Sequence, residues 1–106
     1  MKKQSEGIWI IDSAARTAYV NDRMAEILGV PPSEMLGQDS LHYVFPEDLD
    51  NARRLFQGKK SGDTSPFRFR LRRPDGVGVW VSVQGTPMYD SAGVFTGIVG
   101  TFSVSE

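Results

Sequence analysis

The sequence predicts an α+β fold, in which one antiparallel sheet of five strands carries short helices on one face. Two short apolar runs come first, residues at helical spacing follow, and the second half of the chain alternates with a period of two. The length of 106 residues fits one compact domain with a modest core.

The first two strands are expected at residues 8–11 and 18–20, as a hairpin closed by a turn at residues 12–16. Residues 8–11 are all β-branched or aromatic, which is typical of a buried strand.

The middle of the chain predicts helices. Asn21 is a suitable N-cap for a first helix, and Gly29 is a suitable residue to end it. A short helical turn is expected over residues 33–37. The longest helix is expected over residues 46–56, with proline in its first turn and Gly58 as its terminator.

Three longer strands follow. Residues 67–72 alternate between apolar and arginine side chains, and residues 79–84 alternate between valine and other residues. Residues 73–76 and 90–93 have the composition of tight turns, and residues 94–104 form the last expected strand.

The composition excludes several classes of function. The 12 basic and 13 acidic residues balance, which gives no electrostatic reason to bind nucleic acid. The absence of cysteine excludes disulfides and thiolate chemistry. Because no apolar run is long enough for a membrane helix or a secretory signal, we expect a cytoplasmic location without membrane insertion.

A series of short motifs resembles the PAS domain family, the sensory-box modules of bacterial signalling proteins. None is specific alone, and the resemblance rests on their joint order and spacing. Together the motifs extend over residues 6–102. The motifs are GIWIID at 7–12, YVN at 19–21, EILG at 26–29, MLG at 35–37, PED at 46–48, RLRRPDG at 70–76, WVSV at 80–83, GTPMYD at 85–90 and GIVG at 97–100.

The resemblance implies the strand order 2-1-5-4-3 and a cavity between the sheet and the helices. It implies a domain at residues 7–104, preceded by a flank at 1–6 and followed at 105–106 by the start of a connector to an output domain. The family commonly ends in an Asp-x-Thr motif that couples the sheet to the output domain. This chain ends instead with Phe102-Ser103-Val104-Ser105-Glu106 and lacks that aspartate.

The candidate ligand cavity is formed by apolar side chains expected on the inner face of the sheet and on the helices. A filled core and a small ligand pocket need the same residues, so both readings stay open. The set comprises Met24, Leu28, Leu55, Phe56, Phe67, Phe69, Val81 and Val83.

The outer face of the sheet is a candidate surface for a second protomer or an output segment. By alternation, we expect Trp9, Ile11, Trp80 and Phe102 to project there, and exposed aromatic residues in a patch mark an interaction surface. We therefore expect a homodimer.

No cofactor is predicted. Haem-binding relatives carry a histidine on the long helix, whereas the only histidine here, His42, precedes it. A light–oxygen–voltage (LOV) type flavin adduct needs a cysteine, so only non-covalent flavin remains open. Glu47, Asp48 and Asp50 are better explained by the start of a helix than by a metal site.

Three functions remain open. The first is a non-catalytic input module that binds a small ligand and controls an output domain, such as a histidine kinase or a cyclic-di-nucleotide enzyme. The second is a ligand-free dimerisation or protein-interaction module. The third is a redox sensor with non-covalent flavin. An enzyme is not expected, because no acid–base pair is visible.

Overall fold

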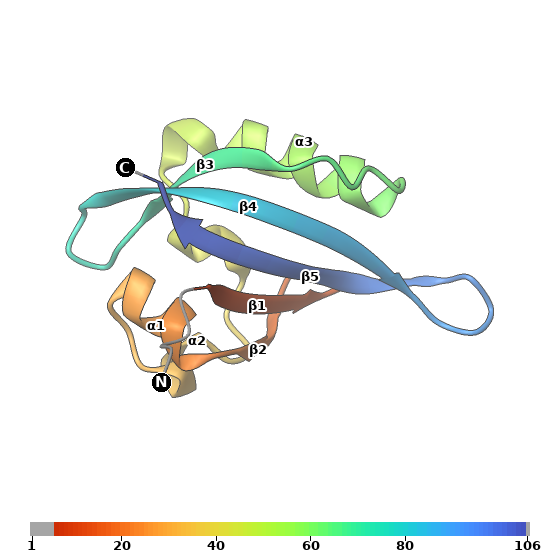
Figure 1. Ribbon diagram of the computed structural model, residues 1–106, viewed down its shortest axis with the longest axis horizontal. Coiled ribbons are helices and arrows are strands. Elements are labelled where there is room, and N and C mark those ends of the chain that lie inside the picture. The colour runs from red at the N-terminus through yellow and green to blue at the C-terminus, as the bar shows by residue number, and fades with distance from the viewer. Residues whose placement is uncertain (1–5, 106) are drawn as a thin grey trace.

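A five-stranded antiparallel sheet forms the frame of the computed structural model, which describes residues 6–105. The strand order β2-β1-β5-β4-β3 confirms the predicted fold class and topology. The strands are β1 (Gly7–Asp12), β2 (Thr17–Val20), β3 (Phe67–Arg72), β4 (Gly78–Tyr89) and β5 (Phe95–Val104). Figure 1 shows the hairpin between β4 and β5 extending beyond the rest of the sheet.

Short helices connect the two halves of the sheet. Figure 1 shows α1 and α2 beside β1 and β2, and α3 running along β3 and β4. None of the helices in the described part of the chain is long and apolar enough to span a bilayer. The helical elements are α1 (Asp22–Leu28), α2 (Pro32–Met35), η1 (Ser40–Tyr43), η2 (Pro46–Asp48) and α3 (Leu49–Lys60).

Asn21 joins the sheet to the first helix. Its side-chain oxygen accepts hydrogen bonds from the backbone amides of Met24 and Ile8, both at 2.9 Å. The first bond caps α1, and the second ties the start of β1 to the same side chain. The predicted cap therefore also fixes the angle at which α1 leaves the sheet.

The long helix differs from its prediction at both ends. Pro46 opens the separate 3₁₀ turn η2, and α3 begins at Leu49. The prediction that Gly58 ends the helix is wrong, because α3 continues to Lys60. Glycine costs about 1 kcal/mol inside a helix. Burial of Lys59 against the sheet holds this last turn in place.

The pairing register decides which side chains face the helices. Phe67 lies opposite Val83, and Phe69 lies opposite Val81, so these four share the inner face. Trp9 lies opposite Gly100, and Gly7 lies opposite Phe102, on the same face.

The prediction that Trp9, Ile11 and Phe102 face outward is therefore wrong. Trp9 is only 5% exposed within the core, and Ile11 and Phe102 are half-buried against it. The reason is that residues 8–11 are all apolar, so alternation gives no sign of which face is inside. The outward position of Trp80, which is 46% exposed, agrees with its prediction.

Candidate ligand cavity

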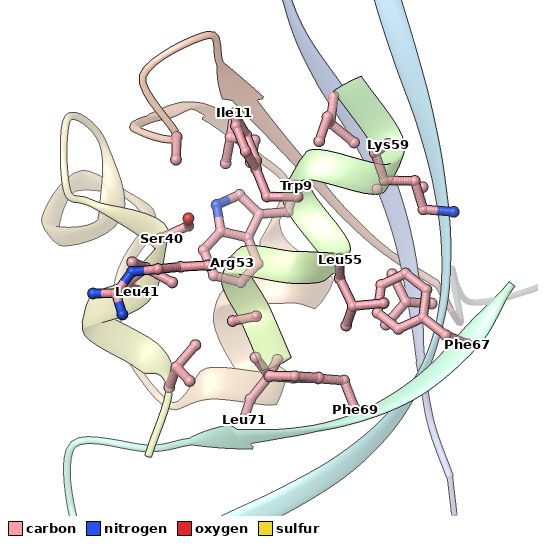
Figure 2. Close-up of a pocket in the computed structure, with 18 of the residues that line it drawn as sticks. Trp9, Ile11, Ser40, Leu41, Arg53, Leu55, Lys59, Phe67, Phe69 and Leu71 are labelled. Carbon is pink, nitrogen blue, oxygen red and sulfur yellow. The ribbon is translucent and has the colours of Figure 1, made fainter. Parts of the chain in front are cut away.

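A cavity of about 260 Å³ lies between α3 and the inner face of the sheet. Side chains from β1, β3, β4 and β5 form one wall, α3 forms the opposite wall, and the segment from Ser40 to Val44 borders one side. Figure 2 shows the Trp9 indole among these elements, with Leu55, Phe67, Phe69 and Leu71 around the same space.

Five of the eight predicted cavity residues line this space: Leu55, Phe56, Phe67, Phe69 and Val83. The other three, Met24, Leu28 and Val81, do not line it. They are fully buried in the core cluster that includes Trp9 and Phe69. The inner apolar set therefore divides into a filled core around α1 and an open space beneath α3.

Sequence reasoning missed several lining residues. The sequence predicts Trp9, Ile11 and Phe102 on the opposite face, and no sequence pattern places Ile98, Leu41 or Val44 at a cavity. Trp9 packs against Phe102 with ring centroids 5.6 Å apart, and against Tyr43 at 5.7 Å in an edge-to-face arrangement. The cavity wall near β1 is therefore aromatic.

Two facing glycines explain how the sheet accommodates these large side chains. Gly85 and Gly100 lie directly opposite each other on β4 and β5. A Cβ atom on Gly100 would lie 2.6 Å from the Phe102 ring, and one on Gly85 would lie 3.2 Å from the Lys59 side chain. The missing side chains thus let the Phe102 ring and the Lys59 methylenes lie flat on the sheet. Glycines inside predicted strands were the available signal for this close approach.

The Trp9 indole has its own polar partner. Its nitrogen donates a 2.9 Å hydrogen bond to the hydroxyl oxygen of Thr17, and both residues are buried. Because the indole offers a single donor, this bond leaves none for a ligand. Trp9 therefore contributes an apolar surface to the cavity.

Lys59 is the buried cation of the cavity wall, with only 3% of its surface exposed. Its ammonium group donates a 2.6 Å hydrogen bond to the carbonyl oxygen of Ser65 and lies 5.3 Å from the centre of the Phe67 ring. These contacts compensate part of the cost of burying the charge. They also tie the end of α3 to the start of β3.

Nearby titratable groups do not form a reactive cluster. Burial raises the pKa of the Tyr43 phenol, and the Glu34 carboxylate adds to the rise, so this phenol stays neutral at physiological pH. His42 is exposed and stacks edge-on against Tyr43. Among residues 6–105, no group of three or more His, Cys, Asp or Glu side chains could hold a metal ion.

Glu47 and Asp48, just before α3, are bound by an arginine of the sheet. Arg70 donates to the carboxylate of Asp48 at 2.9 and 3.1 Å and to that of Glu47 at 3.3 Å. Its guanidinium also lies 4.2 Å from the centre of the Phe45 ring. The pKa of Arg70 is raised, chiefly by the hydrogen bond to Asp48. These contacts fasten the edge strand β3 to the turn before α3.

Comparison with known proteins agrees with this architecture. The family model described as the PAS fold matches residues 17–102, which is most of the chain. The chain belongs to the PAS family. The resemblance in the sequence motifs is thereby confirmed, and the domain is a sensor or input module of the PAS type.

Curated relatives match this chain over a small part of their own length. Protein y4lL of Sinorhizobium fredii is 29% identical over 94 residues, covering 88% of this chain and 11% of the relative. Hypoxia-inducible factor 1-alpha of Gallus gallus is 27% identical over 75 residues, covering 70% of this chain and 9% of the relative. The chain thus spans about a tenth of the length of these relatives.

Solved PAS structures share the fold at low sequence identity. A PAS domain from Colwellia psychrerythraea has a TM-score of 0.85 at 15% identity, covering 96% of this chain and 87% of its own. A light–oxygen–voltage domain studied with a flavin analogue has a TM-score of 0.82 at 19% identity, covering 95% and 78%. A PAS domain from a two-component sensor histidine kinase has a TM-score of 0.76 at 14% identity, covering 97% and 87%.

The absence of cysteine restricts flavin chemistry in this cavity. Without a cysteine the chain cannot form a cysteinyl–flavin adduct of the light–oxygen–voltage type. The structural similarity to a light–oxygen–voltage domain leaves non-covalent flavin open.

Proposed function

We propose that this PAS domain is a non-catalytic input module that binds a small, largely apolar ligand and biases an attached output domain. The cavity beneath α3 carries this proposal, because it has an apolar lining and a volume suited to a small molecule. A ligand that binds one conformation more tightly than another shifts the balance between them.

The end of β5 offers a route from the cavity to an output domain. Phe102 lines the cavity, and Ser105 lies three residues further along the chain. The Ser105 amide donates to the carbonyl oxygen of Trp80 at 2.8 Å, and its hydroxyl accepts from Arg68 at 3.0 Å. The Arg68 guanidinium stacks on Trp80, 4.8 Å from the ring centre. We propose that Ser105 couples the end of β5 to the output domain through these contacts.

We infer that the output domain is a histidine kinase or a cyclic-di-nucleotide enzyme of the bacterial cytoplasm. The similarity to a PAS domain of a two-component sensor histidine kinase supports the kinase, and the similarity to a Sinorhizobium protein supports a bacterial origin. The coding sequence after residue 106 tests it. A eukaryotic transcription factor or a secreted protein at that position would contradict the inference.

A thermal-shift screen tests ligand binding directly. A ligand at 100 times its Kd stabilises the native state by about 2.7 kcal/mol, so the unfolding midpoint must rise. Ala52→Leu, which fills the cavity from α3, should abolish the rise for a cavity ligand. Ala18→Leu, on an exposed position of β2, is the matched control and should leave the rise intact. No rise across a broad library of small metabolites would contradict the proposal.

A second candidate function is homodimerisation through the outer face of the sheet. Tyr19 is 49% exposed there beside half-buried Ile10 and Val99, and Trp80 is 46% exposed further along the same face, next to Ser105. Exposed aromatic side chains on a sheet face favour an interface. Sedimentation at high micromolar concentration should give a dimer that Trp80→Asp converts to a monomer. A monomeric unmodified domain would contradict dimerisation.

A further inference from the structure

The charge distribution around the cavity is one-sided. Among residues 6–105, only two charged side chains line it, Arg53 and Lys59, and both are cations. No aspartate or glutamate in this described range lines the cavity. Charges act more strongly beside an apolar, low-dielectric space than in bulk water, so this lining favours an anionic ligand over a neutral or cationic one.

Arg53 is the cation that a ligand can reach. Figure 2 shows the Lys59 ammonium group pointing away from the Trp9 indole, and its contacts with Ser65 and Phe67 already engage it. Figure 2 also shows Arg53 reaching from α3 toward Ser40 and Leu41 on the opposite side. The ligand's charged group would therefore lie at the Arg53 side of the cavity.

The existing partner of Arg53 leaves it available. The side chain lies 3.6 Å from the carboxylate of Asp50, and both side chains are largely exposed. Exposed ion pairs of this kind contribute little to stability. A guanidinium has five N–H donors, so the contact with Asp50 leaves donors for a ligand. Because Arg53 stays in contact with solvent, a carboxylate paired with it avoids the full cost of burying a charge.

The walls define the rest of the ligand. Trp9, Phe67, Phe69 and Phe102 give an aromatic lining, in which the Phe102 ring lies flat on the sheet over Gly100. Aromatic rings pack favourably against such walls in offset or edge-to-face arrangements. The volume of about 260 Å³ is larger than the roughly 150 Å³ cavity that binds benzene in an engineered protein, so a ring with a short side chain fits.

We propose that the cavity takes a small aromatic monocarboxylate, with its ring against the aromatic wall and its carboxylate paired with Arg53. This inference rests on the proposed function and names the chemical class of the ligand.

Three probes that share a phenyl ring and differ in the charge of the polar end group test the inference. They are phenylacetate (negative), 2-phenylacetamide (neutral) and 2-phenylethylamine (positive). Titration calorimetry should give about tenfold tighter binding for phenylacetate than for the neutral amide, which corresponds to about 1.4 kcal/mol. The amine should bind more weakly than the amide. In NMR spectra, the Trp9 indole N–H signal should shift, while that of Trp80 on the outer face should not.

Arg53→Gln should reduce the preference for phenylacetate over the amide to about threefold or less, while amide binding stays unchanged. The matched control is Arg54→Gln. Arg54 is an exposed neighbour on α3 that hydrogen-bonds to Asn51 and does not line the cavity. This variant should retain the full preference.

Equal or tighter binding of the amide or the amine, with a shift at Trp9, would overturn the ligand class and leave the proposed function standing. A preference that survives Arg53→Gln would likewise overturn the role of Arg53. Failure of all three probes to bind at millimolar concentration would overturn the inference. Failure of the wider thermal-shift screen as well would overturn the proposed function.

Discussion

The indole nitrogen of Trp9 donates a 2.9 Å hydrogen bond to the hydroxyl of Thr17, across the hairpin that opens the chain. Trp9 is 5% exposed and Thr17 is 4% exposed, so neither group can turn to water instead. The bond therefore fixes the orientation of the largest aromatic side chain in the cavity wall.

Thr17→Val keeps the shape of this residue and removes the acceptor. A buried donor without a partner costs about 1–3 kcal/mol, so the free energy of unfolding should fall by that amount. Urea denaturation measures the change. Thr86→Val, at an exposed position of β4, should stay within about 0.5 kcal/mol of the parent. Equal changes in the free energy of unfolding for the two substitutions would show that the hydrogen bond does not stabilise the domain.

Ala15 holds a left-handed backbone conformation, with a φ of 65° in the turn between β1 and β2. This conformation costs a residue with a side chain about 1–2 kcal/mol. Ala15→Gly should therefore stabilise the domain by about 1 kcal/mol in thermal or urea unfolding. Ala14→Gly, one residue earlier and without a positive φ, should instead be neutral or destabilising. Destabilisation by Ala15→Gly would contradict the prediction.

Gly97 and Gly93 both have positive φ values, of 156° and 81°, but they differ in their surroundings. A Cβ atom on Gly97 would clash with the backbone oxygen of Ile11, whereas nothing lies within 4 Å of one on Gly93. Gly97→Ala should therefore cost about 4 kcal/mol or more, because backbone must move. Gly93→Ala should cost only about 1 kcal/mol, for its φ alone. Similar unfolding midpoints for the two variants would refute this difference.

Asp63 accepts hydrogen bonds from both the hydroxyl and the amide of Ser65, at 2.6 and 2.9 Å. The hydroxyl bond is the main cause that lowers the pKa of Asp63 below its ordinary value of 3.8, followed by the amide bond. Because the folded pKa is depressed, the contribution of Asp63 to stability is present above its unfolded pKa. The contribution is lost as the pH falls through the folded pKa.

An NMR titration of the Asp63 carboxyl carbon should therefore give a pKa below 3.8. Ser65→Ala should raise it toward that value by removing the hydroxyl donor. Ser61→Ala, at the C-cap of α3, should leave it unchanged. A pKa at or above 3.8 in the unmodified domain would disprove the assignment.

Much of the fold could be predicted because its signals are local. Asn21 and Gly29 bound α1 as expected, since capping depends on residues within a few positions. The alternation of β3 placed Phe67 and Phe69 on the cavity side. The end of α3 could not be predicted, because Gly58 stays helical only where Lys59 meets the distant Gly85.

The candidate site was predicted less completely than the fold. Leu55, Phe56 and Val83 line the cavity as expected, but Met24 and Val81 fill the core beside it. Apolar side chains look the same in the sequence whether they fill a core or border a space, so only their packing separates the two. The role of Arg53 could not be predicted either, because in the sequence it cannot be distinguished from any exposed arginine on a helix.

By itself, the sequence determined the fold class, the strand order through its family resemblance, and the absence of cysteine chemistry. Composition, turn residues and residue periodicity carry this information along the chain. Only the tertiary structure decided that Trp9 faces inward opposite Gly100, that Lys59 lies flat on Gly85, and that an unfilled space remains beneath α3. These features depend on the register between strands and on contacts between residues far apart in the chain, which no local pattern encodes.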